Sequence, residues 1–388
     1  MRIAYVTHTR FPTEKAHGHQ VAQVCSALAA LGHTVTLVVP DVQTGVRQDA
    51  FAYYGLPKNF SIEKIHAFDA LHHPLVPGAL AFLLSMRSYR KSLRNILSKR
   101  RFDLLYARSP VILPTLVESG MPVIIELHTL PRRGKSGFVK WCNRCKRVVC
   151  LTTPMRDALV GWGVAKKKTM IEGDAVDLAR FAKPLAKSAA KKHHRLPADS
   201  VVVGYVGSLV TFDRLQKGVD LLVRALARMK KQHVPVFGFI VGGPVKWSER
   251  YRKLGYSLGL THHEVQFHVA LPSKQVPSAL AACDILVYPA PASKHPYFRR
   301  DTSPLKLFEY MAAGVPVVCA DIPPVRDVVD ATMVRFAEPG SLASIAGGIK
   351  HILEKPKEAA ARAKKAKEAM KEYTWEKRMK RILAGLSS

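Results

Sequence analysis

The chain has 388 residues, of which 48% are hydrophobic and 23% charged, a mixture that excludes a disordered chain and a fibrous repeat. Lysine and arginine number 60 against 29 aspartate and glutamate residues, a formal net charge of +31, so we expect anionic partners such as nucleic acid, a lipid surface or phosphorylated substrates. No apolar run reaches the ~18–20 residues of a membrane-spanning helix. The first residues are typical of a strand and not of a signal peptide, and six cysteines suit a reducing compartment, so we expect a cytoplasmic protein.

The first half of the chain predicts a parallel sheet. Residues 2–7 form an apolar run, residues 17–31 carry apolar side chains at helical spacing, and residues 34–39 form a second β-rich run. Further strands are expected at 103–107, 123–126 and 147–151. Because strands that alternate with helices form parallel sheets, residues 1–182 are predicted to be one doubly wound, Rossmann-like domain.

Residues 183–200 are rich in Ala, Lys and His between prolines and are predicted to be a linker. The α/β pattern then resumes, and residues 201–372 predict a second Rossmann-like domain. Its strands are expected at 201–206, 236–241, 265–269, 285–288 and 315–320, and two of its helices at 219–231 and 304–313. A final helix within 373–388 is expected to pack back toward the first domain. Two such domains are expected to face one another across a cleft at the carboxyl ends of their sheets, where open α/β sheets bind ligands.

The first loop of the second predicted domain has the residues of a phosphate site. Gly207 and Ser208 follow a strand, and Lys217 and Gly218 precede a helix. Glycine allows close approach of the backbone, the helix N-terminus offers N–H groups, and lysine supplies a charge. A nicotinamide dinucleotide is not expected, because its site needs three glycines after the first strand and only Gly18 is found there.

A second group of residues precedes and begins the helix expected at 304–313. Ser303 is a favourable N-cap and Pro304 a favourable first residue, so the helix end at Ser303, Pro304 and Leu305 is expected to bind an anion. Glu309 lies on an otherwise apolar stretch, where a buried carboxylate needs a donor, and a ribose diol would satisfy it. Asp301 is expected to face the same cavity. The alternative is that both acids only cap and solvate the helix.

The run from Asp301 to Val318 resembles the acidic-x7-acidic signature of the retaining GT-B glycosyltransferases of family 4. The resemblance covers essentially the whole chain. Further segments that resemble the family are found at 11–35, 171–181, 205–209, 217–220, 282–289 and 373–376.

The resemblance implies a retaining glycosyltransferase that moves a sugar from a nucleotide-sugar donor to a lipid-linked, glycan or small-molecule acceptor, with no metal and no other cofactor. It implies that Glu309 holds the donor ribose, that Asp301 contacts the transferred sugar, and that Lys217 neutralises the leaving diphosphate. His128, which ends a strand, is placed near the sugar and the β-phosphate. Without the resemblance, His128 is more simply a structural, hydrogen-bonded side chain.

Three departures from the family pattern concern the site. Ser208 stands where many relatives carry arginine, so Arg214 is expected to supply the second cation for the diphosphate. His17 and Gly18 replace a frequent pair of glycines in the acceptor-side loop. Gly18 is therefore the single residue of this pair at which the backbone can be approached closely. The first acid is aspartate in place of the commoner glutamate.

Residues 79–101 predict a basic amphipathic helix. Its apolar side chains recur at helical spacing, beginning with Phe82 and Met86, and it carries seven cations and no acid. It is either a helix packed on the sheet with a solvated basic face or a surface that also docks on an anionic cytoplasmic membrane leaflet, near a lipid-linked acceptor. Two alternatives to a glycosyltransferase are a nucleotide-sugar epimerase of the same fold and a basic nucleic-acid-binding protein, although no nucleic-acid recognition module is found.

Overall fold

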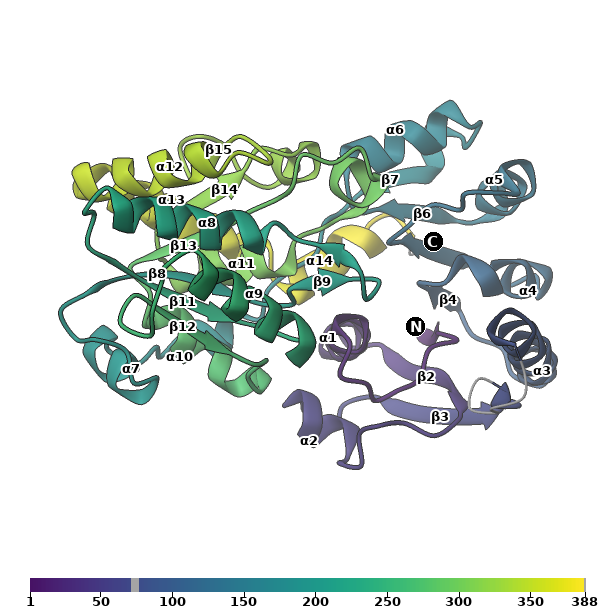
Figure 1. Ribbon diagram of the computed structural model, residues 1–388. Helices are drawn as coiled ribbons and strands as arrows, with labels where there is room; N and C mark the ends of the chain where they lie inside the picture. Colours follow the sequence, from purple (N-terminus) through teal and green to yellow (C-terminus); the bar gives the residue numbers. More distant parts are fainter. Residues whose placement is uncertain (71–76, 387–388) are drawn as a thin grey trace. The chain divides into compact units, whose positions relative to one another are not determined.

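The computed structural model describes residues 1–70 and 77–386 and contains two compact units (Figure 1). The first unit comprises Met1–Gly173 and Trp375–Ser388, and the second comprises Asp174–Thr374. Each unit is an α/β structure built on its own parallel sheet, as predicted.

The first unit contains a seven-stranded parallel sheet in the order β3-β2-β1-β4-β5-β6-β7. Strand β1 lies between β2 and β4, with Ile3 opposite both Val35 and Leu104. The apolar runs found in the sequence form β1, β2, β4, β5 and β6, because both faces of a parallel sheet are buried. The edge strands β3 and β7 were not predicted, and most of their side chains are only partly buried or exposed. The strands are β1 (Arg2–Val6), β2 (Thr34–Asp41), β3 (Ser61–His66), β4 (Leu104–Ala107), β5 (Val123–Leu127), β6 (Arg147–Cys150) and β7 (Thr169–Ile171).

Helices from both ends of the chain cover this sheet. The last helix, α14, belongs to the first unit and packs against α1. None of the helices within residues 1–70 and 77–386 is long and apolar enough to cross a membrane. The helices of the first unit are α1 (Ala16–Ala30), α2 (Ala50–Tyr54), α3 (Gly78–Lys99), α4 (Leu113–Glu118), α5 (Lys135–Arg144), α6 (Thr153–Gly161) and α14 (Trp375–Leu383), with 3-10 turns at Pro110–Ile112 and Lys166–Lys168.

The second unit contains a six-stranded parallel sheet in the order β12-β11-β8-β13-β14-β15 and a two-stranded antiparallel ribbon, β10-β9. The chain reverses its direction of travel across the sheet between β8 and β13. Such a switch point is where open α/β sheets bind ligands. The strands are β8 (Val201–Val206), β9 (Val210–Thr211), β10 (Leu215–Gln216), β11 (Val236–Val241), β12 (Val265–His268), β13 (Ile285–Tyr288), β14 (Val317–Ala320) and β15 (Arg335–Ala337).

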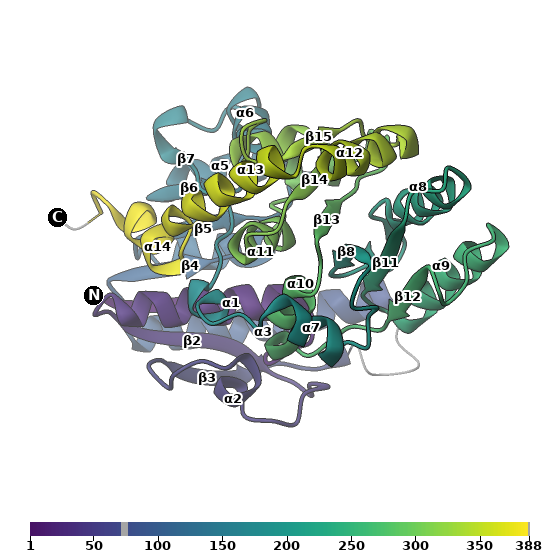
Figure 2. The same ribbon diagram turned by 90° about the vertical axis from the view of Figure 1, so that its left-hand side faces the viewer.

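Helices pack on both faces of the second sheet. On one face α8 lies between α9 and α12 (Figure 2), and on the other face α10 and α11 share a core with the sheet. The helices are α7 (Lys187–His193), α8 (Val219–Lys231), α9 (Val245–Ser257), α10 (Val276–Ala281), α11 (Leu305–Ala313), α12 (Leu342–Glu354) and α13 (Pro356–Ala369), with 3-10 turns at Leu178–Phe181, Ser273–Gln275, Pro323–Asp327 and Met370–Glu372 and a π-helical turn at Tyr297–Asp301.

The boundary region differs from the predicted one. The units divide after Gly173, ahead of residue 182, because Val176 and Phe181 are part of the core of the second unit. Residues 183–200 contain helix α7, and Ala190 of this helix is buried in the same core. The Ala-rich, basic composition of this segment suggests a solvated linker, but Ala190 and Leu196 are buried in the core of the second unit, whereas Leu185 is exposed.

Candidate functional site

The candidate donor site lies at the carboxyl edge of the second sheet, at the switch point between β8 and β13. Gly207 and Ser208 follow β8 directly, and the β9-β10 ribbon leads to Lys217. The ammonium group of Lys217 donates to Ser208 Oγ over 2.8 Å. The predicted phosphate loop therefore brings Gly207, Ser208 and Lys217 together.

Two glycines of this loop are required by its geometry. Gly218 precedes α8 with φ +81°, and a Cβ there would lie 3.0 Å from the backbone of Ala290. Gly207 has φ +145°, and a Cβ there would lie 2.8 Å from Cε of Lys306. Both positions favour glycine because L-residues with a side chain rarely adopt such φ values.

Arg214 does not join this group. It lies exposed in the turn between β9 and β10. Lys306, which sequence reasoning did not assign to the site, reaches it instead: its ammonium group donates to Ser208 O over 3.2 Å and to the hydroxyl of Tyr205. Its position one residue after Leu305, at the start of the predicted helix, is the only local signal that could have suggested it.

Asp301 is buried at the end of the π-helical turn that precedes α11. Arg300 Nε donates to Asp301 Oδ1 over 2.5 Å. Burial raises the pKa of Asp301, and the adjacent Arg300 guanidinium opposes this rise only in part. The carboxyl group is thus held in place beside a cation, within a largely desolvated environment.

Glu309 has a protein partner that the sequence did not reveal. Arg180 NH1, from the 3-10 turn Leu178–Phe181, donates to Glu309 Oε1 over 2.8 Å. Arg180 NH2 also donates to the carbonyl of Ser273 over 2.7 Å, so the guanidinium is held from two sides. The carboxylate is therefore neutralised by an arginine of the same unit, and a ribose diol is not needed to satisfy its burial.

The start of α11 differs from the prediction. The helix begins at Leu305, Pro304 adopts a non-helical ψ of 80°, and Ser303 forms no side-chain cap. Ser303 Oγ instead accepts a hydrogen bond from the backbone N–H of Asp174 over 2.8 Å. The prediction of Ser303 as N-cap and Pro304 as first residue was wrong, because the serine hydroxyl is engaged by a segment distant in the sequence.

In the first unit, His128 lies just beyond β5 and is part of a polar network. His128 Nε2 and Glu126 Oε1 are 2.7 Å apart, and Gln20 Nε2 donates to the same oxygen over 2.7 Å. Arg378 NH1, from α14, donates to Glu126 Oε2 over 3.0 Å, and both side chains of this ion pair are fully buried. The sequence singled out His128 but gave no sign of Arg378, its neighbour in this network.

This network fixes the charge of Glu126. Burial alone would raise the pKa of Glu126, but the Arg378 guanidinium and the hydrogen bonds from His128 and Arg378 outweigh it and hold the pKa well below its usual range. Glu126 is therefore ionised at neutral pH, and it holds the imidazole of His128 by hydrogen bonding.

The predicted acceptor-side residues lie at the start of α1. A Cβ on Gly18 would lie 2.6 Å from Thr13 Cγ2 and would also collide with the hydroxyl of Tyr54. Burial, followed by repulsion from Arg108, lowers the pKa of His17 to about 4, so its imidazole is neutral at pH 7. Because Gly18 has no side chain, the start of α1 can lie close to Thr13 and Tyr54.

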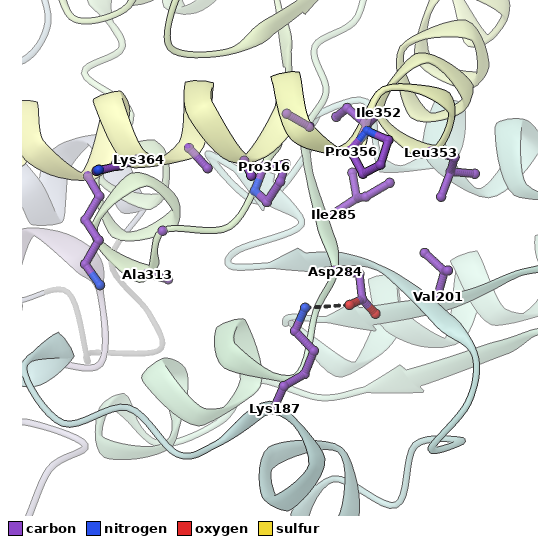
Figure 3. Close-up of a pocket in the computed structure, with 15 residues that line it drawn as sticks. Lys187, Val201, Asp284, Ile285, Ala313, Pro316, Ile352, Leu353, Pro356 and Lys364 are labelled. Atoms are coloured by element: carbon purple, nitrogen blue, oxygen red, sulfur yellow. Dashed lines mark hydrogen bonds and ion pairs between the residues drawn. The ribbon is translucent and has the colours of Figure 1, made fainter.

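A cavity of about 630 Å³ in the second unit lies at the opposite edge of the sheet (Figure 3). Val201 and Ile285, the first residues of β8 and β13, line it together with Asp284 and Lys187, which pair over 2.6 Å. Since the candidate site residues follow the carboxyl ends of these strands, this cavity is not the donor site.

Helix α3 contains the basic segment predicted at 79–101. Its buried side chains include Met86, Tyr89 and Leu93, which pack on the sheet. Phe82, which the spacing assigned to the apolar stripe, is instead exposed, and so is the adjacent Leu83, at 62%. One face of the helix, from Ala81 to Leu97, is therefore buried, and apolar side chains near the start of the helix are exposed.

Two family models match the chain, Glycosyltransferase Family 4 over residues 18–180 and Glycosyl transferases group 1 over residues 186–369. The chain is 28% identical over 209 residues to the 2-deoxystreptamine glucosyltransferase of Streptomyces kanamyceticus, in an alignment that covers 53% of this chain and 50% of that protein. It is 28% identical over 201 residues to the putative teichuronic acid biosynthesis glycosyltransferase TuaC of Bacillus subtilis (strain 168), in an alignment that covers 52% of this chain and 41% of that protein. The chain thus spans about half the length or less of the curated relatives it matches.

Solved structures share the fold over almost the full length. HepE of Anabaena, solved in complex with UDP-glucose, has a TM-score of 0.74 at 18% identity, covering 100% of this chain and 99% of that one. Sucrose-phosphate synthase of Thermosynechococcus elongatus has a TM-score of 0.74 at 18% identity, covering 99% and 98%. Because two family models together match most of residues 18–369 and both parallel sheets fit these neighbours, this chain belongs to the GT-B glycosyltransferase family.

Proposed function

We propose that this protein transfers a sugar from a nucleotide-sugar donor to an acceptor hydroxyl and retains the anomeric configuration. The observation that carries the proposal is the convergence of Lys217, the Gly207-Ser208 turn and the start of α11 at the switch point of the second sheet. Fixed cations and backbone N–H groups at such a place suit a diphosphate.

Glu309 is proposed to bind the donor ribose. Its Oε1 is engaged by Arg180, and a carboxylate has a second oxygen that can accept hydrogen bonds from the ribose diol. Arg180 holds the Glu309 carboxylate in position before the donor binds. Less side-chain entropy is therefore lost on binding than with a mobile carboxylate.

The remaining residues must stabilise the leaving group and position the sugar. As the bond between the anomeric carbon and the β-phosphate oxygen breaks, its electron pair stays on the nucleoside diphosphate. Lys217 is proposed to stabilise this charge, and preorganised charges of this kind supply a large part of many rate enhancements. Asp301 is proposed to contact the transferred sugar, and His128 to lie near the sugar and the β-phosphate.

Turnover of a donor panel tests the proposal. UDP-glucose is the first donor to try, because HepE was solved with it and a curated relative is named a glucosyltransferase; GDP- and ADP-sugars complete the panel. Glu309→Ala and Lys217→Ala should each lower turnover by about 10²-fold, and Asp301→Asn should lower turnover more than nucleotide affinity. Glu354→Ala, an exposed acid on α12, is the matched control.

The same assay separates the alternatives. Nucleotide release that depends on added acceptor excludes an epimerase, whereas conversion of the donor sugar without acceptor would favour one. Full binding and turnover in Glu309→Ala would contradict the placement of the donor. Retention is checked by the anomeric configuration of the product in NMR spectra, and metal independence by unchanged turnover in EDTA.

We also propose that α3 docks on an anionic membrane leaflet, near a lipid-linked acceptor. Leu80 and Leu83 are 47% and 62% exposed, and Arg87 and Lys91 continue the same face at helical spacing and are exposed. Arg90 is not counted, because its guanidinium donates to the carbonyl of Val111. Each cation near an anionic leaflet contributes about 1 kcal/mol.

Cosedimentation with vesicles tests this docking. The protein should bind phosphatidylglycerol vesicles at low salt, dissociate at high salt, and bind phosphatidylcholine vesicles weakly. Leu83→Ser should weaken binding, whereas Leu185→Ser, at an exposed leucine of the second unit, should not. Equal binding to both vesicle types, or to neither, would assign α3 to packing alone and favour a soluble acceptor.

A further inference from the structure

Two lysine side chains from different elements converge on Ser208. Lys217 approaches from the end of the β9-β10 ribbon, and its ammonium group donates to Ser208 Oγ over 2.8 Å. Lys306 approaches from the first turn of α11, and its ammonium group donates to Ser208 O over 3.2 Å and to the hydroxyl of Tyr205. The hydroxyl and the backbone carbonyl of Ser208 are thus each contacted by a lysine ammonium group.

This arrangement places like charges together without an acidic partner. Within the part of the chain that the structure describes, the hydrogen bonds of Lys217 and Lys306 go to hydroxyl and carbonyl oxygens, and neither forms an ion pair with a carboxylate. Burial and the charge of Lys217 hold the pKa of Lys306 well below its usual range, although Glu309 opposes this shift. A bound anion would favour the charged form of Lys306.

The loop is shaped to admit Lys306. A Cβ on Gly207 would lie 2.8 Å from Lys306 Cε and 3.0 Å from Lys306 Nζ, so a side chain at this position would displace the end of the lysine from the loop. Tyr205 also supports the side chain, since the ammonium group lies 4.1 Å from the centre of its ring. The Lys306 ammonium group is therefore held by its contacts with Tyr205 and with the carbonyl of Ser208.

We infer that Lys306 is a second donor-binding cation, which contacts the diphosphate of the donor together with Lys217. The inference rests on the proposed transferase function and gives Lys306 the role that the sequence assigned to Arg214. In the transfer, the bond between the anomeric carbon and the β-phosphate oxygen breaks and its electron pair stays on that oxygen. The acceptor oxygen bonds to the anomeric carbon, and its proton passes to the departing phosphate. Lys306 offsets the charge that develops on this leaving group.

Calorimetric binding of UDP, GDP and ADP, and of the corresponding nucleosides, tests the inference. For the diphosphate that the wild type binds, Lys306→Gln should weaken binding at least 10-fold and leave nucleoside binding unchanged. Lys306→Arg keeps the positive charge and should therefore lose less diphosphate affinity than Lys306→Gln. Lys355→Gln, at an exposed lysine beyond α12, is the matched control and should change neither.

A purely structural role of Lys306 would instead weaken diphosphate and nucleoside binding equally, and that result would overturn the inference. Unchanged diphosphate affinity in Lys306→Gln would overturn it as well. Because affinities are expressed per folded molecule, partial unfolding of the variant does not mask the diphosphate-to-nucleoside ratio. Failure of the wild type to bind any of the three diphosphates would instead overturn the proposed function, and the inference with it.

Discussion

Replacing Arg378 with methionine is expected to destabilise the first unit strongly. The Arg378 guanidinium and the Glu126 carboxylate form an ion pair over 3.0 Å with both side chains fully buried. Arg378 Nε also donates to the carbonyl of Gly173 over 2.5 Å, so the side chain links α14 to two other segments of the same unit. Methionine keeps much of the volume and removes the charge.

The size of the effect follows from the burial of Glu126. Removing one partner of a buried ion pair leaves an uncompensated charge and costs about 3–5 kcal/mol. For a unit of roughly 150–250 residues, 1 kcal/mol corresponds to about 2–4 °C in Tm. We therefore expect the unfolding transition of this unit to fall by about 6–20 °C.

Differential scanning calorimetry at pH 7 measures the shift. The double variant Glu126→Gln/Arg378→Met should recover part of the lost Tm, because it no longer buries a carboxylate without its cationic partner. Arg2→Met is the matched control: Arg2 and Asp103 pair over 3.8 Å at the surface, so its loss should cost less than about 1 kcal/mol.

The pH dependence gives a second check. The lowered pKa of Glu126 in the folded protein contributes stability above the unfolded value of about 4.3, and this stability is lost as the pH falls through the folded value. The variant lacks this contribution, so the difference in Tm between the wild type and Arg378→Met should narrow below pH 4. A shift under 2 °C at pH 7, or no recovery in the double variant, would refute the reasoning.

Two further predictions concern the first unit. Gly18→Ala should lower its Tm by an amount equivalent to about 1–3 kcal/mol, because the new Cβ would meet Thr13 Cγ2 at 2.6 Å and the hydroxyl of Tyr54; Thr13→Ser, which removes the Cγ2 methyl, should restore part of the loss in calorimetry, and full stability of Gly18→Ala alone would contradict the packing. Lowering the pH from 7 to 4.5 should destabilise the unit, because burial lowers the pKa values of His8 and His17 to about 4 and unfolding returns them toward 6.5. The unfolded state then binds more protons, so stability falls with falling pH; His8→Gln should flatten the plot of Tm against pH, and an unchanged slope would count against this cause.

The amino-acid sequence alone was enough to predict the parallel α/β architecture and most of its elements. Apolar runs and helical spacing predicted β8, β11 and β13 at the residues where they are found, because a buried parallel strand needs a continuous apolar segment. The loop with Gly207, Ser208 and Lys217 was also predictable. Its residues are close in the sequence and occupy the end of a strand and the start of a helix.

The pairing of the charged groups could not be predicted in this way and depends on the folded arrangement of the units. Arg180 and Glu309 are separated by 129 positions, and Glu126 and Arg378 by 252. Lys306 reaches Ser208 across 98 positions. Such contacts depend on the order of strands in a sheet and on which helix packs beside them, and neither leaves a local signal in the spacing of residues. The same holds for Ser303, whose hydroxyl is bonded by the distant N–H of Asp174 although its local sequence predicts an N-cap. A side chain with several possible partners takes the one that packing of the whole unit brings within hydrogen-bonding distance.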